Sequence, residues 1–202
     1  MINGTLVIIG AGGHGRVAAD VAALCGYEKI LFLDDGAPSG VQIAGTTADF
    51  KGYLKNADFF VAIGSCAVRE KIFGILEAEG AEIVSLIHPN AVVSPSAEIR
   101  RGAVVMAGAV VNCGAVIGRG AIINTCSSVD HDSAVGDFSH VSVGAHLAGS
   151  VTLGKRVFIG AGATVINNIS VCDDCTVGAG AAVVKKISES GTYVGVPARR
   201  IK

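Results

Sequence analysis

Residues 97–123, AEIRRGAVVMAGAVVNCGAVIGRGAII, have an aliphatic side chain at every sixth position, and this spacing holds without insertion over seventeen positions. An α-helix repeats every 3.6 residues and a flat strand every 2, so neither gives a strict period of six. A period of six is typical of a parallel β-helix, in which each repeat forms one short strand and one corner. The sequence therefore predicts a prism of stacked coils. The aliphatic positions are Ile87, Val93, Ile99, Val105, Val111, Ile117, Ile123, Val129, Val135, Val141, Leu147, Leu153, Ile159, Val165, Val171, Val177 and Val183.

A small residue follows four positions after most of these aliphatic residues, and we expect both sets to point into the prism. One repeat buries little apolar surface alone, whereas stacked coils bury a continuous core. Three repeats per coil give about eighteen residues per turn, so the run predicts about five coils in a rod about 25 Å long. The small positions are Ala91, Ala97, Ala103, Ala109, Ala115, Ala121, Ser127, Ser133, Ser139, Ala145, Ala163 and Ala181.

Composition excludes several classes of protein. The 202 residues have a formal net charge of −1, and 16% of them are charged. Basic residues are scattered and aromatic residues are few, which argues against a nucleic-acid partner. The apolar runs are too short for a membrane-spanning helix, and the N-terminus lacks the pattern of a signal peptide. We expect a cytoplasmic protein without nucleic-acid or membrane partners. The surface stretch 103–107 is apolar and predicts a covered face.

Six cysteines in a cytoplasmic protein are expected to be reduced. Cys172 and Cys175 have the spacing of a metal-binding pair, but there is no second pair. Cys175 also falls on a small inward position of its repeat. We therefore expect a packed thiol and no metal.

The first 86 residues follow a different pattern. Apolar runs predict strands at 5–9, 29–33, 59–63 and 83–87, and helical segments are expected at 16–25, 47–54 and 69–79. This order predicts a small Rossmann-like parallel α/β domain over residues 1–86. The β-helix then covers 87–187, and residues 188–202 form a C-terminal tail.

Glycines follow the first predicted strand in a G-x-G-x-x-G pattern at Gly10, Gly12 and Gly15. Such glycines let the backbone approach a phosphate at a helix N-terminus. Asp34 and Asp35 end the second strand, where a carboxylate can meet a ribose or a base. The domain is too short for a dinucleotide fold, which argues against an NAD-binding oxidoreductase and favours a site for one nucleotide. The alternative is that the glycines only form a tight turn.

Histidines are informative in the prism because a repeat that only builds a core has no use for them. His131 lies two residues after an inward valine, near a corner, between Asp130 and Asp132. Neighbouring carboxylates hold one imidazole tautomer and raise its basicity, as a general base requires. One coil later, at +18, comes Gly149, which would leave open space beside the base. Ala161 and Ala179 are also eighteen residues apart, so they are expected to stack on each other. An extended ligand such as a pantetheine arm could lie along these small residues. A surface histidine without function is the alternative.

The chain resembles the hexapeptide-repeat acyltransferases, and in particular the PglD-type nucleotide-sugar N-acetyltransferases and the related NeuD-type sialic-acid O-acetyltransferases. The resemblance covers nearly the whole chain and implies a left-handed β-helix. The motifs that carry it are Gly10-x-Gly-Gly-His14-Gly15, Phe32-Leu-Asp34-Asp35, Ala62-Ile-Gly64, Ile87-His-Pro89, Asp130-His131-Asp132, Gly136-Asp-Phe-Ser-His140-Val and Val194-Gly-Val-Pro197-Ala198.

The resemblance implies acetyl transfer from acetyl-CoA to the 4-amino group of a UDP-linked 4-amino-4,6-dideoxy sugar, in bacterial glycan precursor synthesis. His131 would be the catalytic base and Asp132 would increase its basicity. Some relatives have Glu at that second position, and the shorter Asp reaches His131 only at a corner. The resemblance places acetyl-CoA along His140, Gly149, Ala161 and Ala179, and the nucleotide sugar along Gly12, Gly13, His14, Asp34, Asp35 and Gly64.

We expect direct attack without a covalent intermediate, because no Ser or Cys is placed to form one, and without a metal; a backbone N–H such as that of Gly149 is the candidate oxyanion donor. The C-terminal Gly195-Val-Pro197-Ala-Arg199-Arg200 resembles an ending whose basic residues lie near the coenzyme A phosphate; a solvated basic tail is the alternative. A homotrimer with shared sites is expected. Three other functions stay open: transfer to a GDP- or dTDP-linked amino sugar, O-acetylation of a sialic acid, and a trimeric scaffold with a nucleotide-sensing domain.

Overall fold

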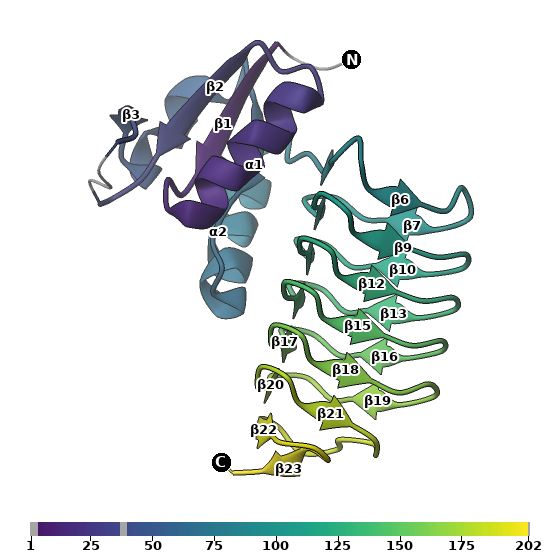
Figure 1. Cartoon of the computed structure of the whole chain (residues 1–202). Coiled ribbons are helices and arrows are strands. Elements are labelled where there is room, and N and C mark those ends of the chain that lie inside the picture. Colours follow the sequence, from purple (N-terminus) through teal and green to yellow (C-terminus); the bar gives the residue numbers. More distant parts are fainter. Residues whose placement is uncertain (1–3, 37–39, 202) are drawn as a thin grey trace. The chain divides into compact units, whose positions relative to one another are not determined.

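A computed structural model describes residues 4–36 and 40–201. These residues form two compact units, of which the first ends at Pro89 and the second begins at Asn90. The N-terminal unit has a four-stranded parallel sheet in the order β3-β2-β1-β4 (Figure 1). Helix α1 packs on β1 and β2, and helix α2 on β4. The elements are β1 Thr5–Ile9, α1 Gly13–Leu24, β2 Lys29–Leu33, β3 Ile43–Gly45, the 3-10 helix η1 Thr47–Tyr53, β4 Asp58–Val61, α2 Cys66–Ala78 and β5 Leu86–Ile87.

The strand predicted over residues 83–87 forms only in part. Ile83 forms a single parallel bridge with Phe59, and only Leu86 and Ile87 form a separate short strand. Ile83 and Leu86 are both buried although they are three residues apart. Val84 and Ser85, which lie between them, belong to neither a strand nor a bridge, so the predicted strand is interrupted there. The fourth strand of the sheet is instead the three-residue β3, which pairs with β2.

The C-terminal unit is a parallel β-helix whose coils stack from teal to yellow in Figure 1. We name its three sheets the first, second and third face. The first face holds β6 Val92–Val93, β9 Val110–Val111, β12 Ser128–Val129, β15 His146–Leu147, β18 Thr164–Val165 and β21 Ala182–Val183. The second holds β7 Glu98–Ile99, β10 Val116–Ile117, β13 Ala134–Val135, β16 Thr152–Leu153 and β19 Ser170–Val171. The third includes β8 Val104–Val105, β11 Ile122–Ile123, β14 His140–Val141, β17 Phe158–Ile159, β20 Cys175–Val177, β22 Gly191–Val194 and β23 Arg199–Arg200.

Strands pair with partners eighteen residues away, as in Ser128 with His146 and His146 with Thr164. Six strands stack in the first face, so the prism is about one coil longer than expected. The aliphatic and small positions together line one continuous core, as predicted from the period of six. We name the turns that lead from the first to the second face the first corner, and those from the third to the first face the third corner.

Residues 188–202 were expected to form a tail, but the described part of this segment extends the third face. Strand β22 pairs in parallel with β20, and β23 returns antiparallel to β22. The apolar stretch 103–107 also differs from the expectation of a surface awaiting cover. Val104 and Met106 are fully buried within the chain itself.

Cys175 is buried in the prism core, and its Sγ lies 3.5 Å from that of Cys172. Burial raises the pKa of the Cys175 thiol to about 12, so it stays protonated and packs as an apolar group. Within residues 4–36 and 40–201 no group of three or more His, Cys, Asp or Glu side chains could hold a metal ion. In the same residues, each helix is too short or too polar to cross a membrane.

Candidate active site

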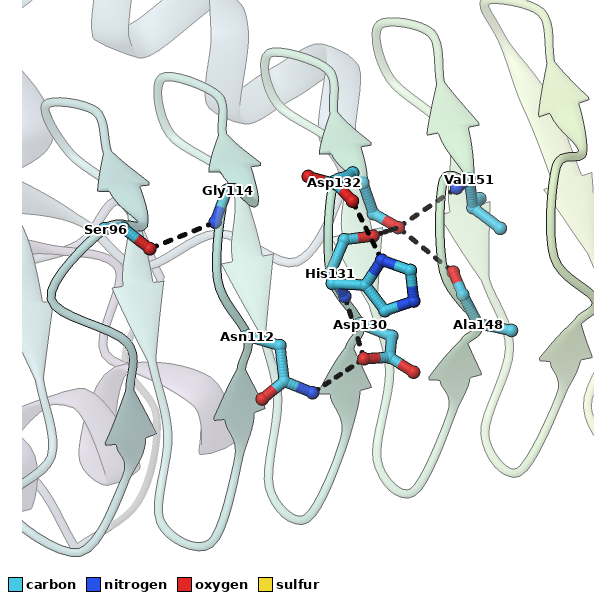
Figure 2. A network of polar contacts seen from close by, with 9 residues as sticks. Ser96, Asn112, Gly114, Asp130, His131, Asp132, Ala148 and Val151 are labelled. Carbon is cyan, nitrogen blue, oxygen red and sulfur yellow. Dashed lines mark hydrogen bonds and ion pairs between the residues drawn. The ribbon is translucent and has the colours of Figure 1, made fainter.

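His131 and Asp132 occupy the turn of one coil at the first corner (Figure 2). Asp132 has a φ of 58°, in the left-handed region, so the two neighbours do not point to opposite sides as they would in a strand. The imidazole Nδ1 of His131 lies 2.9 Å from the Asp132 carboxylate. The short Asp therefore reaches its neighbour because the pair sits at a corner.

Two carboxylates act on His131 from different sides. The bond to Asp132 raises the pKa of the imidazole, and the charge of Asp130 adds to this effect. Asp130 accepts hydrogen bonds from the backbone N–H of His131 and from the amide of Asn112, both at 2.8 Å. These two bonds hold the pKa of Asp130 below its ordinary value, so it stays ionised. With Nδ1 directed at Asp132, Nε2 is the ring atom left to accept a proton.

A glycine lies on each side of this pair. A methyl group built on Gly149 would lie 2.5 Å from Nε2 of His131, so any other residue would displace the ring. Gly149 does not have a positive φ, so the backbone itself does not demand glycine there. One coil before, a methyl group on Gly114 would lie 2.7 Å from the Asp132 carboxylate. The two glycines leave room for the two side chains.

Backbone N–H groups at several corners are available to a ligand. The N–H groups of Arg119 and Lys155 donate to aspartate side chains stacked on them, at 2.8 and 2.9 Å. The equivalent N–H groups of Gly149, Ala161 and Ala179 donate no hydrogen bond to the described part of the chain. Such outward-pointing donors suit the carbonyl groups of an extended ligand, or an oxygen that becomes negative during a reaction.

The four residues expected along acetyl-CoA lie in three places. Gly149 stands beside His131 at the first corner, whereas Ala161 and Ala179 stack at the exposed third corner. His140 lies in β14 of the third face and is buried. Its Nε2 lies 3.0 Å from the amide of Asn124, and its ring packs edge-on against Phe158. The predicted set is therefore not one contiguous patch within a single chain.

A second site lies in the N-terminal unit, in a pocket of about 440 Å³. It forms at the carboxyl ends of β1, β2 and β4, where a parallel sheet of this order binds ligands. All six residues expected to contact the nucleotide sugar line this pocket: Gly12, Gly13, His14, Asp34, Asp35 and Gly64. Thr47, Ile63, Val68 and Ile72 also line it and were not expected from the sequence.

The glycines of the first turn divide into two kinds. Gly10 has a φ of 103°, and any Cβ on Gly15 would overlap the carbonyl of Gly10, so both are required by the tight strand-to-helix turn. Gly12 and Gly13 have open space around them and begin α1, whose first N–H groups suit an anion. The tight turn therefore accounts for Gly10 and Gly15, whereas Gly12 and Gly13 remain open to a ligand.

The two aspartates after β2 also stabilise loops. Asp34 accepts the backbone N–H of Ala11 at 2.6 Å and that of Gly36 at 2.7 Å. Asp35 accepts the N–H and the hydroxyl of Thr47. His14 is half-buried, and burial followed by the charge of Arg69 lowers its pKa to about 4. His14 is therefore neutral near pH 7 and can act as a hydrogen-bonding group in the pocket.

Asn112 and Gly114 contact the His131 region but were missed by the sequence analysis. The period of eighteen residues marks both, because Asn112 precedes Asp130 by one coil and Gly114 precedes Asp132 by one coil. Our expectation covered only the following coil.

The basic residues near the C-terminus line a pocket of about 320 Å³ in the β-helix. Lys185, Lys186, Arg199 and Arg200 surround it, together with Tyr193. Arg200 also lies 3.3 Å from Glu189, so the group is partly neutralised. The segment is thus an ordered part of the prism that can accept an anion.

Comparison with known proteins bears on the family and the fold. The model of the PglD N-terminal domain matches residues 5–76, and that of the hexapeptide repeat of succinyl-transferase matches residues 150–185. GDP-perosamine N-acetyltransferase of Escherichia coli O157:H7 is 29% identical over 78% of this chain and 76% of its own length.

Two solved structures match almost the whole chain. The acetyltransferase domain of PglB from Neisseria gonorrhoeae FA1090 has a TM-score of 0.93 and 43% identity, covering 98% of this chain and 99% of that one. It has also been solved with acetyl coenzyme A. PerB from Caulobacter crescentus, in complex with CoA and GDP-perosamine, has a TM-score of 0.93 and 39% identity, covering 98% and 97%. The predicted fold class, an α/β domain followed by a left-handed parallel β-helix, is confirmed. The chain belongs to the PglD-type hexapeptide-repeat family of acetyl-CoA-dependent sugar N-acetyltransferases.

Proposed function

We propose that this enzyme transfers the acetyl group of acetyl-CoA to the 4-amino group of a nucleotide-linked 4-amino-4,6-dideoxy sugar. The observation that carries the proposal is the His131–Asp132 pair at an exposed corner, with Gly149 packed so closely that a Cβ on it would lie 2.5 Å from Nε2; we assign the N–H of this glycine as the oxyanion donor. A base and an oxyanion donor at one point are what attack on a thioester requires.

The reaction is a direct transfer. The sugar amine attacks the thioester carbonyl carbon while Nε2 of His131 takes one of its protons, and Asp132 stabilises the imidazolium that forms. The N–H of Gly149 donates to the oxyanion. When the C–S bond breaks, the sulfur leaves with the proton from His131, and an amide and free CoA result. General-base help of this kind contributes about 10²–10⁴-fold.

Binding of the two substrates uses separate parts of the chain. The nucleotide sugar occupies the pocket lined by Gly12, Gly13, His14 and the aspartates after β2. The free N–H groups of Ala161 and Ala179 suit the amide carbonyls of the pantetheine arm, and the basic pocket near β23 suits the coenzyme A phosphate.

Two nucleotides are candidates for the acceptor. A UDP-linked sugar is favoured by the PglD-type pattern, in particular Phe32-Leu-Asp34-Asp35. A GDP-linked sugar is favoured equally by the relatives, because PerB binds GDP-perosamine and the Escherichia coli relative is named for it. O-acetylation of a sialic acid is the outcome to expect if no amine acts as acceptor.

We further propose that the active form is a homotrimer with sites between neighbouring prisms. Ala161 and Ala179 lie at a different corner from His131, so one chain does not bring the proposed acetyl-CoA contacts and the base together at one edge. Val143, at the third corner, and Ile166 are exposed apolar residues that a neighbour could cover. A sedimentation mass equal to one chain under assay conditions would contradict this.

The test is release of free thiol from acetyl-CoA with UDP-, GDP- and dTDP-linked 4-amino-4,6-dideoxy sugars and with a sialic acid. We expect turnover with one amino sugar, and a loss of at least about 10²-fold in His131→Ala. Turnover that survives this replacement would remove His131 as the base. Thiol release only with the sialic acid would move the acceptor from nitrogen to oxygen.

A further inference from the structure

Two breaks in the small-residue pattern lie one coil after two serines. The inward position that is alanine in most repeats is valine at Val151 and at Val157. Each of these valines stacks on a serine eighteen residues earlier, Ser133 and Ser139. All four side chains are buried, so the two serine hydroxyls must find hydrogen-bond partners inside the prism.

In the ordinary corner, the N–H at the small position donates to the carbonyl three residues earlier. Ala145 donates to Ser142 in this way, and Ala163 donates to Gly160, both at 3.0 Å. Val151 instead donates to Oγ of Ser133 at 3.0 Å, and this hydroxyl donates to the carbonyl of Ala148 at 3.0 Å. The hydroxyl of Ser133 thus lies between the N–H of Val151 and the carbonyl of Ala148, in place of the direct hydrogen bond of the ordinary turn.

The bridged turn contains Gly149, and it rests directly on the turn of His131. The N–H of Ser150 donates to the carbonyl of His131 at 2.9 Å, and Oγ of Ser133 lies 3.5 Å from that same carbonyl. Figure 2 shows Ala148 and Val151 on the coil next to that of His131. One buried hydroxyl therefore contacts both turns of the proposed catalytic corner.

We propose that Ser133 is a positioning residue for the acetyl transfer. By opening the 148–151 turn and bridging it, its hydroxyl sets where the Gly149 N–H lies relative to Nε2 of His131. The inference rests on the proposed function of His131. Ser133 itself touches neither substrate.

The chain provides a matched control. Ser139 makes the same bridge in the next turn, donating to Gly154 at 2.8 Å and accepting from Val157 at 2.9 Å, but that turn is not stacked on His131. Ser133→Ala and Ser139→Ala remove the same two bonds from equally buried sites, so we expect equal losses in Tm. Only Ser133→Ala should lower kcat, by about tenfold or more, with KM for the nucleotide sugar unchanged. Equal kcat values for the two variants would overturn the proposal.

A second pair of variants guards against loss of folding. Ser133→Ala with Val151→Ala recreates the alanine-on-alanine stack that Ala145 and Ala163 already form, in which the N–H can bond its own turn directly. We expect this double variant to fold and still show the lower kcat, whereas Ser139→Ala with Val157→Ala keeps wild-type kcat. A double variant with wild-type kcat would show that the bridge has no positioning role.

Positioning can also be measured without turnover. The ring resonances of His131, assigned by their absence in His131→Ala, should shift in Ser133→Ala and stay in place in Ser139→Ala. If wild type acetylates none of the sugars, the proposed function fails, while the His131 resonance still decides whether Ser133 positions this corner. An unchanged resonance in both variants would overturn the inference.

Discussion

Replacement of Gly149 by Ala is the sharpest test of the proposed catalytic corner at His131. The added methyl group would lie 2.5 Å from Nε2 of His131, so the ring must retreat by about 1 Å to reach an ordinary contact. A displacement of about 1 Å in a reacting group can cost about 10²-fold in rate. That factor corresponds to about 2.7 kcal/mol in the activation free energy.

The fold should tolerate the same change. The side chain of His131 is 53% exposed, so its ring can rotate towards solvent without disturbing the core. Gly149 does not have a positive φ, and alanine at such a position stabilises by about 0.4–1 kcal/mol through the unfolded state. We expect Tm to stay the same or rise slightly while kcat falls about 10²-fold. Gly74→Ala in α2, where an added Cβ would have no atom within 4 Å, serves as the control and should keep full activity.

The assay is thiol release from acetyl-CoA in wild type, Gly149→Ala, His131→Ala and the double variant. If the methyl group acts by displacing His131, Gly149→Ala should cost nothing further once His131 has been truncated. The same loss factor in both backgrounds would refute this reasoning and would indicate that the methyl group blocks a substrate instead.

Three further predictions concern the two units. Asp132→Asn keeps a residue that tolerates the φ of 58° but replaces the carboxylate, whose hydrogen bond and, to a lesser extent, charge raise the pKa of His131. The base must be neutral to act, so the fall of kcat/KM on the acid side of its pH profile should move to lower pH. The maximal kcat/KM should decrease about tenfold or more. An acid-side fall at the wild-type pH would show that Asp132 does not set the pKa of His131. In Gly15→Ala, the new Cβ would overlap the carbonyl of Gly10, so the tight turn from β1 into α1 could not form as it is. We expect a lower Tm in thermal melts followed by circular dichroism, and an unchanged Tm would contradict this. Tyr27→Phe removes a buried bond of 2.8 Å to Asp58 and should lower unfolding free energy by about 1–3 kcal/mol in a urea titration, without affecting kcat; a kcat loss would mean that this bond matters to the site.

The prism was predictable because its physics is local and repeated. Each inward residue faces the same constraint one coil later, so the spacing of Val105, Ile123 and Val141 in the sequence already specifies their stacking in the structure. The neighbour of any corner residue follows by adding eighteen, which is how Gly149 was placed beside His131. Non-repeating parts lack this redundancy. Strand β3 was missed because three residues, one of them glycine, give no periodic signal.

The pocket of the N-terminal unit was predictable for a different reason. Parallel strands place their carboxyl ends at one edge, so residues that follow β1, β2 and β4 meet there whatever their separation in sequence. The wall residues Thr47 and Ile72 come from helical segments whose placement over that edge depends on tertiary packing. The hydrogen bonds of Asp34 to the glycine loop could not be read from the sequence either, because they depend on the distance between two loops.

Departures from the repeat then become the most informative positions in the chain. Alanine at an inward corner position is the ordinary residue of the repeat. A buried serine at this position needs a hydrogen-bond partner for its hydroxyl, and a valine needs space in the core for two more methyl groups. Ser133 and Val151 both differ from the alanine of the repeat and lie eighteen residues apart. The N–H of Val151 donates a hydrogen bond to the hydroxyl of Ser133. A second such pair exists without a histidine on its corner, so the device serves folding in general. The specific claim is that the hydroxyl bridge of Ser133 also positions the turn beside His131. Comparing Ser133→Ala with Ser139→Ala separates this positioning role from the general role in folding.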